Sequence, residues 1–144
     1  MKTVALIEKG KDGAFGIFTP DIKSTIIGSG ATVAEAKMDF ENSVREVKEM
    51  YEESGKPLPK ELQNIEFEYK YDIASVFDEY SFLNVSKFAE YSGIDASLMR
   101  QYKTKKDIYV SETQIKKIES GFHKAAKDFF SPLLVFKRSG DNKE

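Results

Sequence analysis

The chain has 144 residues, of which 40% are hydrophobic and 12% aromatic, so it can bury one core of ordinary size or two small ones. It has no Cys and a single His, which excludes disulfides, thiolate zinc sites and multi-histidine metal clusters within one chain. Residues 133–136 form the longest apolar stretch near the end and cannot span a membrane, and the apolar run after Met1 is too short for a secretory signal. We therefore expect a folded cytoplasmic protein with no metal and no cofactor.

The net charge of -2 hides an asymmetry along the chain. Residues 1–72 carry 10 basic and 14 acidic side chains, whereas residues 73–144 carry 12 basic and 10 acidic ones. Residues 96–106 include four basic side chains and no acidic one. This stretch is a candidate phosphate-contacting surface, although a solvated helix face is the commoner meaning of a few basic residues.

The first 30 residues predict three antiparallel strands. Residues 2–8 are β-prone, and the turn residues 9–13 lead into a second run at 14–19. Pro20 ends this run, and the β-branched residues 24–27 predict the third strand.

A helix follows this sheet. Gly28-Ser29-Gly30 is interpreted as a tight turn into it, because as a phosphate loop it lacks a third glycine and the Lys-Ser/Thr ending. Thr32 and Glu35 form a capping box, in which Glu35 should accept from the amide of Thr32. Gly55 can end the helix in the left-handed conformation. The apolar residues at spacings of three and four should cover the sheet: Val33, Ala36, Phe40, Val44, Val47 and Tyr51.

The pattern changes twice after this helix. Residues 65–71 alternate apolar and charged side chains, which predicts a half-buried strand that rejoins the sheet. From Asp72 onward, caps and apolar spacing predict four helices: one over residues 73–80, one after Asn84, one after Asp95, and one from a capping box at residues 111–114. We expect an α+β protein with domains at 1–71 and 72–136 and a flexible tail at 137–144.

Residues 84–102 have the spacing of a helix-turn-helix. Ala89 is small where the second helix would press against the first, and Gly93 supplies the positive φ of the turn, although an aliphatic residue is more usual than Ser92 just before it. Arg suits guanine, Gln suits adenine, and Ser or Lys suits phosphates. The alternative is a helical hairpin that binds protein or nothing. The candidate DNA-binding residues are Ser97, Arg100, Gln101, Lys103, Lys105 and Lys106.

Several motifs resemble those of the HicB family of antitoxins. VALIEKGKDGAF at residues 4–15 and GSGATVAEAK at 28–37 are similar to its N-terminal domain. YDIASVF at 71–77, SFLNVS at 81–86 and SLMRQY at 97–102 resemble its helix-turn-helix variant. Together these resemblances cover nearly the whole chain.

The resemblance implies a partial RNase H-like N-terminal domain, made of a three-stranded antiparallel sheet, a helix and a fourth strand, that masks a small HicA-like mRNA-cleaving toxin. It also implies an all-α helix-turn-helix domain that binds the promoter of its own operon as a repressor, in a homodimer or higher oligomer. The residues themselves are compatible with this, because an acidic first half suits a small basic toxin and a basic helix suits double-stranded promoter DNA. Residues 133–136 are a candidate dimer contact or, equally, the core of a last strand.

The first hairpin is bordered by candidate toxin-binding residues: Asp12, Phe15, Phe18 and Asp21. Phe15 and Phe18 fall on opposite faces of the predicted strand, so we expect one of them to belong to the core.

A metal-dependent nuclease is a rival hypothesis, because RNase H-like nucleases hold two metal ions with converging carboxylates. Glu8 is the only acid on the first strand, and Glu35, Asp39 and Glu46 lie on a helix whose outer face must be polar anyway. The only histidine, His123, has no second catalytic group in the pattern. We therefore expect that the protein is not an enzyme.

The other rival is a stand-alone transcription factor whose N-terminal domain senses another protein or a small ligand. The residue pattern does not separate it from an antitoxin. A small basic neighbour that copurifies would favour the antitoxin.

Overall fold

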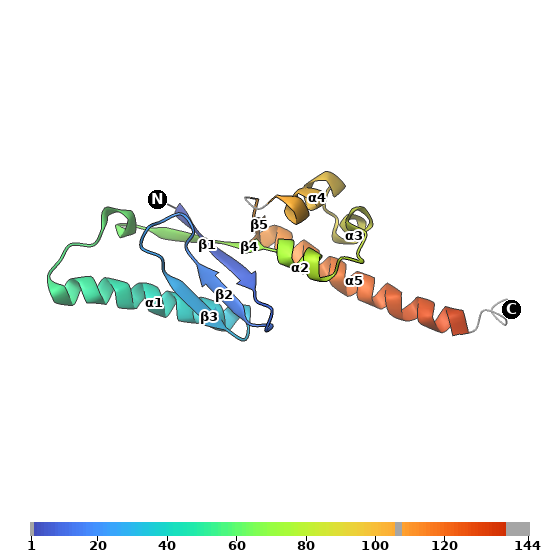
Figure 1. Ribbon diagram of the computed structural model, residues 1–144, viewed down its shortest axis with the longest axis horizontal. Helices are drawn as coiled ribbons and strands as arrows, with labels where there is room; N and C mark the ends of the chain where they lie inside the picture. Colours follow the sequence, from blue (N-terminus) through green and yellow to red (C-terminus); the bar gives the residue numbers. More distant parts are fainter. Residues whose placement is uncertain (1, 106–107, 138–144) are drawn as a thin grey trace.

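The computed structural model describes residues 2–105 and 108–137, with side chains for all of these except 75, 79 and 129–137. Within these ranges the protein is α+β, with a mixed five-stranded sheet and five α-helices. The strands follow the order β3-β2-β1-β4-β5, α1 lies along one face of the sheet, and α2 to α5 gather at one end of it (Figure 1).

The three antiparallel strands predicted at the start of the chain are confirmed. β1 (Lys2–Lys9) pairs with β2 (Phe15–Phe18), and β2 pairs with β3 (Ile27–Gly30). The predicted fourth strand is β4 (Glu66–Asp72), which rejoins the sheet parallel to β1. The short 3-10 helix η1 (Lys60–Leu62) precedes it.

The position of the third strand differs from the prediction. β3 includes Gly28, Ser29 and Gly30, so this segment is not a turn between strand and helix. A Cβ on Gly28 would lie 2.5 Å from the backbone nitrogen of Phe40, and one on Gly30 would lie 2.6 Å from that of Ala36. The two glycines are needed because the backbone of α1 approaches this strand too closely for a side chain.

The capping residues define the bounds of α1 (Val33–Ser54). Thr32 Oγ1 accepts from the amide of Glu35 at 3.1 Å, as predicted, whereas Glu35 accepts from the amide of Ala31 at 3.2 Å and not from that of Thr32. Gly55 ends the helix at φ 70°. Ala36 and Phe40 are buried against the sheet, and the remaining members of the predicted stripe are half-buried beside them.

The four predicted helices of the second half are α2 (Ala74–Glu79), α3 (Val85–Ser92), α4 (Ala96–Thr104) and α5 (Glu112–Lys137). This half is not wholly helical, because the short strand β5 (Val110–Ser111) pairs antiparallel with β4. Residues 133–136 belong to α5 and not to a last strand. Of the predicted tail, Lys137 is the last residue of α5, and residues 138–144 lie outside the described ranges.

A close helix crossing holds the core of the second half. This core is centred on Phe77, Phe88 and Met99. α5 packs on α3 where Gly121 meets Ser92, because a Cβ on Gly121 would collide with Ser92 Oγ and lie 3.1 Å from Ser92 Cα. Ser92 Oγ also donates to the carbonyl of Phe88 at 3.1 Å. The serine that was unusual for the motif is therefore a small residue that allows α5 to approach, with its hydroxyl satisfied by the preceding turn.

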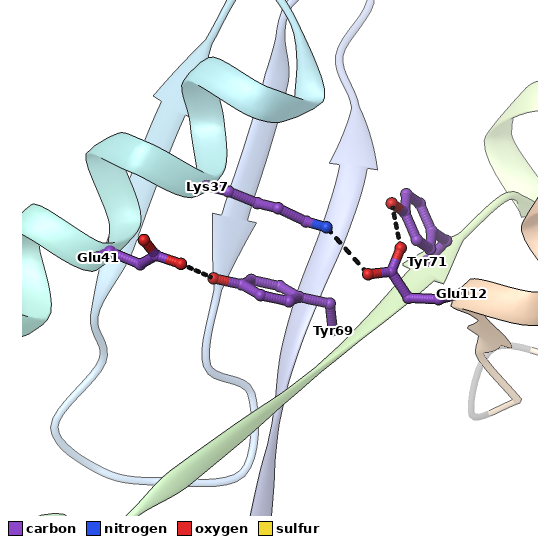
Figure 2. A network of polar contacts seen from close by, with 5 residues as sticks. All are labelled: Lys37, Glu41, Tyr69, Tyr71 and Glu112. Atoms are coloured by element: carbon purple, nitrogen blue, oxygen red, sulfur yellow. Dashed lines mark hydrogen bonds and ion pairs between the residues drawn. The ribbon is translucent and has the colours of Figure 1, made fainter.

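A polar network joins the two halves (Figure 2). Lys37 Nζ on α1 donates to Glu112 Oε1 at 2.9 Å, and Tyr71 on β4 donates to Glu112 Oε2 at 3.0 Å. Tyr69 donates to Glu41 Oε2 at 3.1 Å, and the ammonium of Lys37 lies 4.5 Å from the centre of the Tyr69 ring. The first residue of α5 is thus bonded both to the sheet and to the helix that covers it.

Candidate nucleic-acid interface

Local hydrogen bonds define the two helices of the predicted helix-turn-helix. Asn84 Oδ1 accepts from the amide of Lys87 at 3.0 Å at the start of α3. Asp95 Oδ2 accepts from the amide of Leu98 at 3.2 Å at the start of α4. Gly93 ends α3 at φ 67°, in the left-handed region. The two caps and the conformation of the glycine are as predicted from the residue types.

Buried side chains set the orientation of α4. Met99 is fully buried, and Ile94 and Tyr102 are buried in the same core cluster. Ala89 on α3 is buried as well, which agrees with its expected place between the helices. Because residues at spacings of three and four share one helix face, Met99 and Tyr102 leave the opposite face of α4 to solvent.

The predicted DNA-binding residues lie on that face and at its edges. Ser97, Arg100 and Lys105 are exposed, while Gln101 and Lys103 are half-buried. Lys105 is the C-cap residue of α4, whereas Lys106 lies outside the described residues. The structure therefore brings Ser97, Arg100, Gln101, Lys103 and Lys105 onto one helix and its C-terminal end.

A contact between the two helices holds Arg100. Its Nη1 donates to Ser86 Oγ on α3 at 2.9 Å. A guanidinium has five N–H donors, so this bond leaves most of its donors for another acceptor. Ser86 was missed at the sequence level, because nothing in the spacing shows that a side chain 14 positions earlier will meet Arg100.

The electrostatics of this surface favour an anion. Between the helix start at Ala96 and its cap at Lys105, the side chains include three cations and no carboxylate. α3 adds the exposed Lys87, whose ammonium lies 3.8 Å from Glu90. Asp95, the acid that directly precedes α4, accepts from the amide of Leu98. These donors can hold phosphates and base edges.

The predicted toxin-binding residues do not form one surface. Phe15 is half-buried and packs against the core between the sheet and α1, whereas Phe18, which is also half-buried, lies on the other face of β2. Asp12 Oδ1 accepts from the amide of Ala14 at 3.0 Å and so shapes the β1–β2 turn, and Asp21 is exposed in the loop after β2. Of the two phenylalanines expected on opposite faces, Phe15 is the one that packs against the core, but it is half-buried and lies at the edge of the core.

Two of the carboxylates considered for a nuclease have other partners. Asp39 Oδ2 accepts from the amide of Ser29 at 2.9 Å, and Glu35 caps α1. Glu46 and His123 are exposed. In the part of the chain that the structure describes, no group of three or more His, Cys, Asp or Glu side chains is arranged to hold a metal ion. Over the same residues, no helix has the length and apolar character needed to cross a membrane.

Comparison of the chain with models of known protein families, with curated proteins and with solved structures found no match.

Proposed function

We propose that the protein is a DNA-binding repressor in which α3 and α4 form a helix-turn-helix and α4 is the recognition helix. The observation that carries this proposal is the outward face of α4, on which Ser97 and Arg100 are exposed while Met99 is buried behind them. On this face Arg100 donates a hydrogen bond to Ser86 of α3. A guanidinium that is already held by one hydrogen bond loses less conformational freedom on binding guanine than a free one does. Gln101 and Lys103 lie near it on the same helix, where Gln101 is suited to adenine and Lys103 to a phosphate.

A second copy completes the DNA-binding unit in this proposal. Two helix-turn-helix domains bind half-sites about 34 to 36 Å apart on one face of the duplex, so a homodimer or higher oligomer is required. Residues 133–136, in the last turns of α5, are the proposed additional dimer contact. Sedimentation at micromolar protein concentration measures the oligomeric state, and a monomer would exclude this mode of DNA binding.

We further propose that the first half is a partial RNase H-like, HicB-like domain that masks a small basic HicA-like toxin. The resemblance of residues 4–15 and 28–37 to HicB antitoxins supports this, and so do the strand-strand-strand-helix-strand order of residues 2–72 and the acidic excess of this half. The proposed contact surface is the sheet face opposite α1. On that face the strand register sets Phe18 between the buried Leu6 and Ile27, which is 64% exposed.

A gel shift with the DNA upstream of the coding sequence, with and without the product of the neighbouring gene, tests both proposals together. The repressor predicts a complex that is weakened by salt. The antitoxin predicts that the neighbouring protein binds this chain and is inactive when bound. If no complex forms with the upstream DNA at low salt, the repressor is wrong. Failure to neutralise the neighbouring protein would exclude the antitoxin alone.

The alternative is a stand-alone transcriptional regulator whose first half senses another protein or a ligand. One observation favours it, namely an apolar cavity between the two halves that is lined by Ile7, Phe77 and Phe122. Purification of the native complex separates the two functions, because an antitoxin copurifies with a small basic protein and a ligand-sensing regulator does not.

A further inference from the structure

An apolar cavity lies at the junction of the sheet with α1, α2 and α5. Its volume is about 150 Å³. β1 and β2 contribute Ile7 and Phe15, α2 contributes Phe77, and α5 contributes Ile118 and Phe122. Side chains from both halves of the chain therefore line it, and it is open to solvent on one side.

Three carboxylates, those of Glu8, Asp72 and Glu119, and one ammonium group, that of Lys9, line this apolar space. Glu8 and Asp72 are direct neighbours in the parallel register of β1 and β4, and both line the cavity. Asp72 Oδ1 accepts from the amide of Ala74 at 3.2 Å, and neither carboxylate has an ion pair among the described residues. The nearest cation in sequence, Lys9, lies over the Phe15 ring with its Nζ 5.9 Å from the ring centre.

The protonation behaviour of Glu8 agrees with this placement. Glu8 is exposed at the surface, but partial burial of its carboxyl raises its pKa above the ordinary value, and the negative charge of Asp72 raises that pKa further. A cation placed between the two carboxylates would relieve both effects, because an opposite charge favours the ionised form. Three carboxylates against the single ammonium group of Lys9 leave this rim with an excess of negative charge, which favours a positively charged group over an anion.

The size of the cavity limits the apolar part of a ligand. A dry apolar cavity of about 150 Å³ accommodates one benzene ring. A second, more open cavity of about 390 Å³ shares Lys9, Val76 and Phe122 with the first and continues between α5 and the loop after α2, past Tyr80 and Phe82. One aromatic ring thus fits inside, and a larger substituent has space outside.

We propose that this junction is a binding site for an arylalkyl amine, whose ring lies among Ile7, Phe77 and Ile118 and whose ammonium group lies between Glu8 and Asp72. Apolar enclosure with a few polar groups at one end is the usual composition of small-molecule sites. The site is independent of the DNA-binding face of α4, so its test does not depend on the proposed function.

Titration calorimetry with the full-length protein and three probes of the same shape tests the proposal. The probes are phenethylamine, which is a cation, ethylbenzene, which is uncharged, and phenylpropionic acid, which is an anion at neutral pH. We expect phenethylamine to bind at least about tenfold more tightly than either of the others, since a hydrogen bond to a charged group is worth about one such factor. Equal binding of all three, or no binding of phenethylamine at millimolar concentration, would overturn the proposal.

Three variants locate the site. Glu8→Gln removes the rim charge with little change of shape and should weaken phenethylamine binding about tenfold. Val33→Phe adds a ring at a residue that lines the cavity and should abolish binding. Glu68→Gln changes an exposed carboxylate on β4 that does not line the cavity and should leave binding unchanged. If Val33→Phe fails to fold, the comparison of Glu8→Gln with Glu68→Gln decides alone, and equal affinities in those two variants would exclude the site.

Discussion

Lys37 Nζ on α1 lies 2.9 Å from Glu112 Oε1 at the start of α5, although the two residues are 75 positions apart in the chain. The contact is partly shielded, because the two side chains are 27% and 44% exposed. Tyr71 donates to the other oxygen of the same carboxylate, so Glu112 connects α1, β4 and α5 (Figure 2). The two halves of the chain are therefore joined by a polar contact that lies beside their apolar cores.

The free energy of unfolding of the Glu112→Gln variant should depend less on pH than that of the wild-type protein. Burial alone would raise the pKa of Glu112, but hydrogen bonds from Lys37 and Tyr71 outweigh it and lower the pKa below the ordinary value of 4.5. A carboxyl with a lowered pKa in the folded state stabilises the fold above its unfolded pKa, and this contribution is lost as pH falls through the folded pKa. We expect the variant to be less stable at neutral pH by about 1 kcal/mol or less, because the pair is partly exposed.

Urea unfolding at a series of pH values from neutral to below 4.5 measures this difference. The gap between wild type and Glu112→Gln should close as the carboxyl becomes protonated. Glu49→Gln, at an exposed position of α1, is the matched control. A gap that stays constant down to the lowest pH would show that Glu112 acts through packing and not through its charge.

Elements with local signals were predictable from the sequence. Thr32, Asn84 and Asp95 are caps because their short polar side chains reach the amides three positions later, and this depends only on neighbouring residues. β5 had no such signal, because two residues have no periodicity, and Val110–Ser111 is a strand only through its pairing with β4. At Gly28 the local preference for a turn was overridden by the approach of α1.

For the candidate site, too, the features that depend on neighbouring residues were predictable and the contacts between elements were not. The apolar residues Ile94, Leu98 and Met99 sufficed to predict that Ser97 and Arg100 lie on the outer face of α4. In the structure Ser97 and Arg100 are exposed, Ile94 and Met99 are buried and Leu98 is half-buried. The partner of Arg100 was not predictable, since Ser86 is on another helix and the crossing of the two helices decides which side chains meet. The cavity beside Glu8 could not be predicted from the residue pattern either, because its lining residues come from both halves of the chain.

Gly121→Ala should destabilise the second half. A Cβ at this position would collide with Ser92 Oγ, so α5 would have to move away from α3. Overpacking of this kind costs about 1 to 3 kcal/mol. Denaturant unfolding of Gly121→Ala, Ser92→Gly and the double variant forms a cycle, in which Ser92→Gly should recover part of the loss. Strict additivity of the two single changes would contradict the proposed contact.

Gly28→Ala should destabilise the first half, whereas Gly16→Ala should not. A Cβ at Gly28 would lie 2.5 Å from the backbone nitrogen of Phe40, which cannot yield without moving α1 away from the sheet. Nothing lies within 4 Å of a Cβ at Gly16. We expect a loss of about 1 to 3 kcal/mol for Gly28→Ala, and no loss for Gly16→Ala. Similar melting temperatures for both variants would contradict this packing.

Arg100→Ala should reduce discrimination between the operator and altered operators. An arginine that contacts guanine contributes about 1 to 3 kcal/mol of specificity. Ser86→Ala removes the hydroxyl that holds Arg100 and should give a smaller loss in the same direction, since the guanidinium remains but is less fixed. Gln101→Ala should relax preference at a different base pair. The measurement is binding to the upstream DNA and to single-base variants of it, and unchanged preference in Arg100→Ala and Gln101→Ala would show that α4 is not the recognition helix.

Lys105→Ala should weaken binding to all DNA sequences alike. Lys105 is exposed at the C-cap of α4, where an ammonium group is suited to a phosphate and not to a base edge. Each phosphate contact contributes about one unit to the slope of log affinity against log salt, so the variant should lower that slope by about 1. Lys48→Ala, at an exposed position of α1, is the control and should leave the slope unchanged. A change of sequence preference in Lys105→Ala, with the slope unaltered, would place this lysine at a base and contradict the proposed orientation of α4 on DNA.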